Sequence, residues 1–278
     1  MKKVSIALFA MLFMVGFAHA QNEASVTQAG NWNEASIEQA GYDNEASIYG
    51  NQYANNNEHK QIQVGDNNTA SARLFSDKME GRQLQTGSDN YSALNQAMKY
   101  AYARTVQAGS GNFADVHQSS GKSSEVHVGQ LGDENTAGIK QSGEDNLVAM
   151  IQIGDENQVG TNHHSYPGVV QSGEDNITLI GQKGDQNSAT VDQSGWDNKT
   201  LIGQLGDGNS ADVVQSGSDN KNIVAQLGSD NAAYVMQSGS DNMGSIVQFS
   251  SNNIATINQS GSNNNANINQ SGNSIIIQ

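Results

Sequence analysis

The sequence predicts an all-β fold: a β-solenoid of stacked strand–turn–strand repeats, in which two sheets face each other in a cross-β arrangement. Three observations predict it. Gln recurs every eleven residues along most of the chain, and Gly and Asn follow most of these Gln residues at fixed distances. Between turns, inward and outward positions alternate, as at Ala189, Val191 and Gln193, which is typical of a strand with one buried face. The intervening Gly-x-x-Asn segments suit tight turns, because Gly and Asn tolerate a positive φ.

The composition bounds the class of protein. The chain has 278 residues, with no Cys, one Pro, 30 Gly and 35% hydrophobic residues. It is too polar to fill an ordinary apolar core, and it offers no disulfide, thiolate metal site or cysteine nucleophile. With 13 basic against 28 acidic residues, the net charge of −15 argues against a protein that binds duplex nucleic acid. We therefore expect neither an ordinary enzyme nor a nucleic-acid binder.

Residues 1–20 have the pattern of a secretory signal peptide. Two Lys residues precede an apolar run that ends at an A-x-A cleavage site, Ala18-His19-Ala20. We expect the mature chain to begin at Gln21, and we expect residues 21–278 to form a single repeat domain.

Each repeat is predicted to be a strand followed by a turn. An eleven-residue period could also describe a right-handed helical supercoil. Gly in almost every repeat excludes that reading, because each Gly costs about 1 kcal/mol inside a helix. Turns of the type Gln193-Ser-Gly-Trp-Asp-Asn198 alternate with a second type in which a larger residue follows Gln, as Leu205 does. Two strands and two turns then form one layer, and the chain is long enough for about eleven layers spaced by about 4.8 Å.

Two segments depart from the repeat. In residues 50–106, Leu74 replaces Gln and Met79 replaces Asn, so we expect irregular repeats there. An irregular turn is expected at residues 163–168, where His163-His164-Ser165-Tyr166-Pro167 lies at the point where a regular arc should close. The two His residues are expected in a loop rather than in a metal site, because adjacent side chains on a strand point apart.

The Gln and Asn side chains are predicted to point inward and to stack on identical residues one layer away. A buried amide without a partner costs roughly 1–3 kcal/mol, and an amide carries both donors and acceptors, so stacked amides can satisfy each other. The expected Gln ladder comprises Gln28, Gln39, Gln107, Gln141, Gln152, Gln171, Gln182, Gln193, Gln204, Gln215, Gln226, Gln237, Gln259 and Gln270. The expected Asn ladder comprises Asn146, Asn157, Asn176, Asn187, Asn198, Asn209, Asn220, Asn231, Asn242 and Asn253. The expected turn glycines are Gly143, Gly154, Gly173, Gly184, Gly195, Gly206, Gly217, Gly228 and Gly239.

The two ends of such a solenoid expose strand edges. The first strand is expected at residues 22–28 and the last at residues 274–278, each with unpaired backbone donors and acceptors. Identical uncapped ends join head to tail without closing into a ring, which predicts a filament built from copies of this chain.

The repeat resembles the curlin repeat, S-x5-Q-x-G-x-x-N-x-A-x3-Q, of the secreted curli fibre subunits of Gram-negative bacteria. Gln193-Ser-Gly195-Trp-Asp-Asn198 and Asn209-Ser-Ala211-Asp-Val-Val-Gln215 carry the resemblance, which covers nearly all of the mature chain. It implies an extracellular amyloid fibre for biofilm matrix and surface adhesion, with no catalysis and no cofactor. As partners it implies copies of the chain, a nucleator subunit, and an outer-membrane secretion pore with accessory proteins. Neither nucleic-acid binding nor membrane insertion of the mature chain is expected.

Two alternatives stay open. Gly-Asp pairs such as Gly184-Asp185 and Gly206-Asp207 could form the calcium turns of a monomeric adhesin β-roll, although such rolls have a period of about nine residues. A basic and aromatic stretch favours a minor nucleating or adhesive subunit of the fibre, although a solvated face would explain it equally simply. This stretch comprises Arg73, Lys78, Arg82, Lys99 and Arg104 with Tyr91, Tyr100 and Tyr102.

Overall fold

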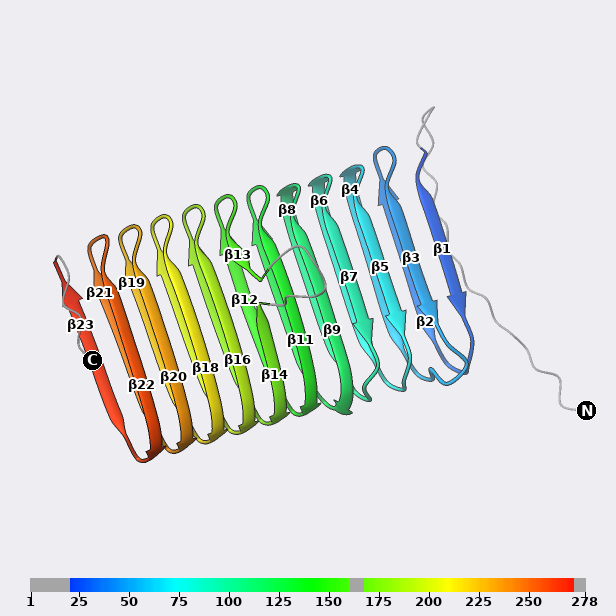
Figure 1. Ribbon diagram of the computed structural model, residues 1–278. Coiled ribbons are helices and arrows are strands. Elements are labelled where there is room, and N and C mark those ends of the chain that lie inside the picture. The colour runs from blue at the N-terminus through cyan, green and yellow to red at the C-terminus, as the bar shows by residue number, and fades with distance from the viewer. Residues whose placement is uncertain (1–20, 161–167, 273–278) are drawn as a thin grey trace, which may run out of the picture.

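The structure, a computed structural model, describes residues 21–160 and 168–272. They form a solenoid in which the chain passes back and forth between two parallel sheets, layer upon layer, to give the long stack of Figure 1. The predicted fold class, an all-β solenoid of about eleven layers with two facing sheets, is confirmed. In the part of the chain that the structure describes, no helix is long and apolar enough to span a membrane.

The strands alternate between the sheets along the chain, and we call the twelve-stranded sheet "sheet I" and the eleven-stranded sheet "sheet II". Sheet I contains β1 (Glu23–Gln28), β3 (Glu45–Gly50), β5 (Thr69–Leu74), β7 (Tyr91–Gln96), β9 (Phe113–Lys122), β11 (Thr136–Glu144), β13 (Gln158–Val159), β14 (Val169–Glu174), β16 (Ser188–Trp196), β18 (Ser210–Ser218), β20 (Ala232–Ser240) and β22 (Ile254–Ser262). Sheet II contains β2 (Glu34–Ala40), β4 (Glu58–Asp66), β6 (Glu80–Ser88), β8 (Tyr102–Ser110), β10 (Glu125–Leu131), β12 (Leu147–Ile153), β15 (Ile177–Lys183), β17 (Lys199–Leu205), β19 (Lys221–Leu227), β21 (Met243–Phe249) and β23 (Asn265–Ser271).

Neighbouring strands are parallel and in register, so equivalent residues of successive repeats lie over one another. Gln193 in β16 pairs with Gln215 in β18, and Gln215 pairs with Gln237 in β20. Because side chains alternate between the two faces of a strand, this register builds columns of like residues along the solenoid. The interior columns between the amides hold small or branched apolar residues, such as the fully buried Ala189 and Val213.

One insertion is accommodated within the stack. β13 and β14 occupy a single strand position of sheet I, between β11 and β16. The segment between them includes most of the expected irregular turn at residues 163–168, and His163 and His164 lie outside the described residues. Gln141 and Gln171 remain paired across this position although they are 30 residues apart, so the added residues leave the columns in register.

Residues 50–106, where irregular repeats are expected, continue both sheets in unbroken order from β3 to β8. Their interior differs in composition, and one layer is longer, since Gln39 and Gln63 pair although they are 24 residues apart. Leu74, Met79, Met98 and Ala101 lie in a separate apolar cluster, at positions where other layers have Gln, Asn or Gly. The fold therefore accepts larger apolar residues at these positions when the neighbouring layers leave room for them.

Candidate functional site: amide columns and open sheet edges

An unbroken column of Gln side chains runs along the inner face of sheet II. The Nε2 of each Gln donates a hydrogen bond to the Oε1 of the Gln in the next layer, as from Gln182 to Gln204 at 2.8 Å and from Gln204 to Gln226 at 2.9 Å. The column comprises Gln39, Gln63, Gln85, Gln107, Gln130, Gln152, Gln182, Gln204, Gln226, Gln248 and Gln270.

The matching column of sheet I is interrupted near its start. Gln28 pairs in register with Gly50, which in turn pairs with Leu74. Within the described residues, the buried Nε2 of Gln28 has no hydrogen-bond partner, nor has the Oε1 of Gln96, which follows Leu74. From Gln96 onward the column is continuous and comprises Gln96, Gln118, Gln141, Gln171, Gln193, Gln215, Gln237 and Gln259.

Each Gln also joins the two sheets. Besides its bond along the column, Gln204 Nε2 donates to the backbone carbonyl of Ser188 in the facing sheet at 2.9 Å, and Gln226 Nε2 donates to that of Ser210 at 2.9 Å. One side chain thereby uses two donors and one acceptor, a combination that only amides supply among uncharged side chains. This requirement explains why a Gln, rather than any polar residue, recurs at this position.

Asn side chains at the turn ends form two further columns. The Oδ1 of Asn209 accepts hydrogen bonds from the backbone N–H of Asn231 at 3.2 Å and from its Nδ2 at 2.9 Å. Asn209 Nδ2 also donates to the carbonyl of Gly228 at 2.9 Å, which holds the turn of the next layer. The structure buries all ten of the Asn residues singled out in the sequence: Asn146, Asn157, Asn176, Asn187, Asn198, Asn209, Asn220, Asn231, Asn242 and Asn253.

The turn glycines have a backbone conformation that other residues rarely adopt. Positive φ values occur at Gly143, Gly154, Gly173, Gly184, Gly195, Gly206, Gly217, Gly228 and Gly239. At Gly195, φ is 105°, and an added Cβ would collide with the carbonyl oxygen of Gly217 in the next layer. The layers approach too closely here for any side chain.

The Gly-Asp pairs hold backbone groups of the neighbouring layer. Asp207 Oδ1 accepts the backbone N–H of Asp185 at 3.0 Å, and Asp185 Oδ1 accepts that of Asp155 at 2.9 Å. Sequence reasoning missed this column, because it becomes visible only when the register of the layers is known. Among the described residues, no group of three or more His, Cys, Asp or Glu side chains is placed to hold a metal ion.

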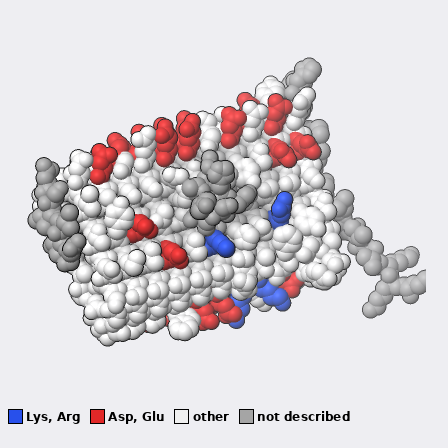
Figure 2. All heavy atoms as spheres, viewed as in Figure 1, with Lys and Arg blue, Asp and Glu red and all other residues white. Residues whose placement is uncertain are grey.

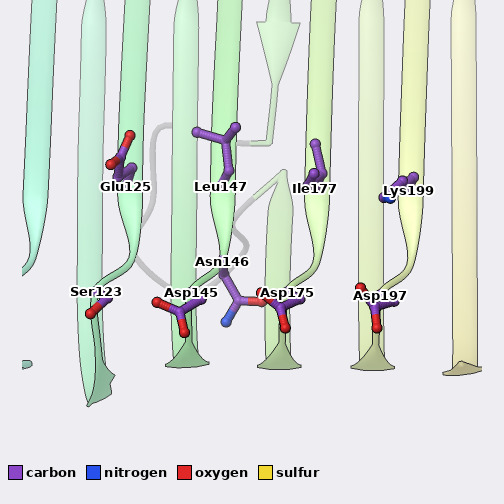
Figure 3. A pocket seen from close by; sticks show the side chains of 9 residues that line it. All are labelled: Ser123, Glu125, Asp145, Asn146, Leu147, Asp175, Ile177, Asp197 and Lys199. Carbon is purple, nitrogen blue, oxygen red and sulfur yellow. The ribbon is translucent and has the colours of Figure 1, made fainter. Parts of the chain in front are cut away.

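Carboxylates also line the turns that leave sheet I. Asp145, Asp175 and Asp197 take the same position in successive layers and line one shallow hollow beside Lys199 (Figure 3). Figure 2 shows Asp and Glu gathered along the turn edges of the stack, whereas the face between these edges is largely uncharged. Like charges stacked at this spacing repel one another, which opposes the approach of layers.

A buried polar network, also missed from the sequence, lies between β4 and β8. The Nε2 of His59 is 3.1 Å from Gln83 Oε1, Gln83 Nε2 donates to Ser92 Oγ at 2.9 Å, and Ser92 Oγ is 2.7 Å from Thr105 Oγ1. Burial lowers the pKa of His59 from 6.5 to about 4, against a smaller opposing effect of its hydrogen bond to Gln83. Gly81 lies directly over His59, and a Cβ there would overlap the imidazole ring.

The basic residues of the middle segment do not converge on one site. Arg73 lies in sheet I, whereas Arg82 and Arg104 lie in sheet II. Arg82 pairs with Glu80 at 2.8 Å, and Lys99 pairs with an Asp of the preceding layer at 3.5 Å. Neighbouring carboxylates therefore neutralise part of the charge that made this stretch a candidate binding surface.

The solenoid has open sheet edges at both of its described ends. β1 and β2 form one end, and β22 and β23 form the other, at opposite extremes of the stack (Figure 1). The last strand expected from the sequence, at residues 274–278, lies outside the described residues.

A family comparison identifies the repeat. The family model described as Curlin associated repeat matches residues 21–49, 102–132, 132–160, 168–195, 195–228, 223–249 and 239–272, which is more than half of the chain. No curated protein matches the chain. The matched segments consist of strand–turn layers that carry the amide columns, and the columns also continue through the unmatched residues 50–101, as at Gln63 and Gln85. The chain therefore belongs to the curlin repeat family, a family of structural fibre subunits.

Proposed function

We propose that this protein is a secreted subunit that assembles head to tail into extracellular, curli-like amyloid fibres. The observation that carries the proposal is the match between the two ends of the solenoid. In the part of the chain that the structure describes, β1 and β22 are the edge strands of sheet I, and β2 and β23 are the edge strands of sheet II. A second copy can add β1 to β22 and β2 to β23, so each sheet continues as itself across the joint.

The amide columns support the same joint. Head-to-tail stacking places Gln28 of one copy over Gln259 of the other. Along both columns Nε2 donates toward the C-terminal end, as from Gln237 to Gln259 at 2.6 Å. The Nε2 donor of Gln259 therefore faces the Oε1 acceptor of Gln28.

Export, biofilm formation and adhesion belong to the same proposal. The pattern of residues 1–20 supports secretion through the general export route, and the family supports a fibre at the cell surface. We infer that residues 21–278 act as one domain, and that an outer-membrane pore, accessory proteins and a nucleator serve it. In this proposal, the amide columns hold together the layers within each subunit and also the subunits within the fibre.

A pair of Pro substitutions in the first layer tests the joint. In parallel pairing, alternate residues bond to opposite neighbours. The N–H groups of Glu23 and Glu34 bond to the following layer, so those of Val26 and Ile37 point to the open edge. Val26→Pro with Ile37→Pro removes donors that only the joint uses, and Pro is tolerated at such an edge.

The expected result is a soluble β-rich chain that does not elongate. The matched control, Val26→Ala with Ile37→Ala, loses similar apolar volume but keeps both N–H groups, and it should still form filaments in dye-binding assays and electron microscopy. Equal elongation by the Pro and Ala variants would contradict the proposed joint. A wild-type chain that remains monomeric for days at micromolar concentration would contradict the proposed function.

A nucleating subunit is the second candidate. It is favoured by the interruption of the sheet I column at Gly50 and Leu74, which gives one end of the solenoid fewer amides to stack. A chain that shortens the lag of another curli subunit, but does not elongate on its own seeds, would favour this role over that of a major subunit.

A further inference from the structure

The outer face of sheet II carries a pattern that the solenoid itself does not require. Between β10 and β21, two neighbouring mid-strand columns point outward, and in each layer one of the two residues is large and the other is small. Column P comprises His127, Ala149, Leu179, Leu201, Ile223 and Ser245. Column Q comprises Gly129, Ile151, Gly181, Gly203, Ala225 and Val247.

The glycines of column Q are unexplained by the fold. Gly181 and Gly203 do not have the positive φ of the turn glycines, and an added Cβ on either would meet no atom within 4 Å. Gly in a strand costs roughly 0.5–1 kcal/mol relative to Ala. A strand glycine without a conformational reason marks a place where another molecule approaches the backbone closely.

Apart from His127, the large residues of the two columns are apolar, and most of them are exposed. Ile151 exposes 53% of its surface, Leu201 45% and Ile223 48%. Between them a shallow apolar hollow opens over Gly181, bordered by Leu179. In the layers from β12 to β21, a large apolar residue therefore lies beside a small one, and a shallow hollow is left over the small residues next to Leu179 and Leu201.

This surface is confined to one region of one sheet. In the N-terminal layers of sheet II, column P continues as Lys60, Arg82 and Arg104. On sheet I, the equivalent outward residues include Asp192 and Asp212, and burial together with repulsion from Asp212 raises the pKa of Asp192. The repeat therefore accepts charged residues on its outer faces. The solenoid fold does not by itself require the large apolar and small residues of columns P and Q.

We propose that this face binds the same face of a second copy, related by a two-fold axis parallel to the solenoid axis. Such an axis reverses the strand direction and keeps the stacking direction, so column P of each copy lies against column Q of the other. Leu201 then fills the groove over Gly203 of the second copy, and Ile151 meets Ala149. Both copies have the same layer spacing, so the fit repeats in every layer.

The size of the face suits a specific interface. Six layers spaced by about 4.8 Å, each about 20 Å wide, give roughly 580 Å² per copy and about 1,160 Å² in total, above the roughly 1,000 Å² of a specific interface. Sheet edges then join subunits along a fibre, and this face pairs two solenoids side by side.

Cross-linking tests the axis. The chain has no Cys, so single introduced thiols report cleanly. A mixture of the Leu201→Cys and Gly203→Cys chains, treated with dibromobimane, should cross-link more than either chain alone, because the axis sets column P against column Q. A Leu201→Cys chain that cross-links with itself as well as the mixture does would overturn the axis. No cross-linking in any combination, in soluble or fibrous protein, would overturn the pairing.

Groove filling tests the fit. Gly181→Leu with Gly203→Leu adds apolar surface but fills the grooves, and the mass per length of the fibres should fall by half. Adding Leu179→Gly and Leu201→Gly exchanges ridge and groove, keeps the composition and should restore paired fibres. A filled-groove variant that pairs like wild type, or an exchanged variant that does not pair, would overturn the proposal. Val214→Leu with Met236→Leu on sheet I is the matched control and should leave the mass per length unchanged.

Elongation is followed separately by dye binding, so failed growth is distinguished from failed pairing. If the wild-type chain forms no fibres, the same variants are compared as soluble solenoids by sedimentation. A wild-type dimer that the filled-groove variant lacks supports the pairing without fibres, and a wild-type monomer overturns it.

Discussion

Gln215 illustrates what a column position demands of a single residue. Its Oε1 accepts hydrogen bonds from Gln193 Nε2 and from Thr200 Oγ1, both at 2.7 Å, and its Nε2 donates to Gln237 Oε1 at 3.0 Å. A second demand is size at the interior positions between the amide columns, where a large polar residue needs a small one in the next layer. Gly244 over Asn222 and Gly81 over His59 meet this demand. Columns are therefore specified by hydrogen-bond satisfaction and volume together.

We predict that Gln215→Leu destabilises its layer by about 3 kcal/mol, because Leu fills the space but leaves the amides above and below unpaired. Asp212→Ser, on the exposed face of the same strand, should change stability by less than about 0.5 kcal/mol. Hydrogen exchange of β16 to β20 measures both, and assembly rates should follow the same order. Equal effects of the two substitutions would remove the proposed role of the inward Gln.

His59 makes the N-terminal layers sensitive to acid. Its pKa is about 4 in the folded chain against 6.5 in the unfolded chain, so the unfolded chain binds the proton more readily. The stability that is present above pH 6.5 is lost as the pH falls toward 4, by up to about 3 kcal/mol. Hydrogen exchange of β4 and β6 at pH 7 and pH 4.5 should show this loss in wild type and a smaller one in His59→Ala. The same pH dependence in both proteins would contradict it.

At the scale of strands and turns, much of the fold could be predicted because its signals are local. Alternation sets which residues of a strand face inward, and the Gly-x-x-Asn spacing sets where each strand ends. The segment 50–106 looked irregular because the sequence interleaves two columns, of which only the one in sheet I is broken at Gly50 and Leu74. Gln63 and Gln85 keep the sheet II column intact there. The Asp column and the His59 network depend on which layers adjoin, and sequence alone does not give that.

Gly195 and Gly203 allow the role of glycine in a turn to be compared with its role on an exposed strand. Gly195→Ala should destabilise the chain by about 1–3 kcal/mol, because Ala resists the positive φ and its Cβ meets the next layer. Gly203→Ala, on a strand with open space around it, should be neutral or stabilising by up to about 1 kcal/mol. Urea titrations of the soluble solenoid compare them. A greater loss of unfolding free energy in Gly203→Ala than in Gly195→Ala would show that the two positions have been assigned the wrong roles.

At the scale of the whole molecule, net charge and stacked carboxylates oppose assembly while the sheet edges favour it. The chain carries a net charge of −15 and a sequence pI of about 4.5. Carboxylates recur at equivalent turn positions in several successive layers. Each subunit added to the proposed fibre would lengthen these columns of carboxylates. Screening or partial protonation of these groups should therefore matter more for the rate of assembly than for the fold of one subunit.

We predict a shorter lag when ionic strength is raised from about 0.01 M to about 0.15 M, which reduces the Debye length from about 30 Å to about 8 Å. A pH near the pI should act in the same direction. The variant Asp145→Asn, Asp175→Asn and Asp197→Asn should assemble faster at low salt and respond less to added salt. A wild-type lag time that is indifferent to salt would contradict this role of the turn charges.

The central claim is that a fibre is this solenoid continued through its ends. An electron cryo-microscopy reconstruction of fibres grown from residues 21–278 tests it most directly. The account predicts one layer spacing of about 4.8 Å that runs through every subunit joint. At the joint, Gln259 should stack on Gln28 of the next copy. A joint formed by another surface, or Gln193, Gln204 and Gln215 turned toward solvent in the fibre, would contradict it.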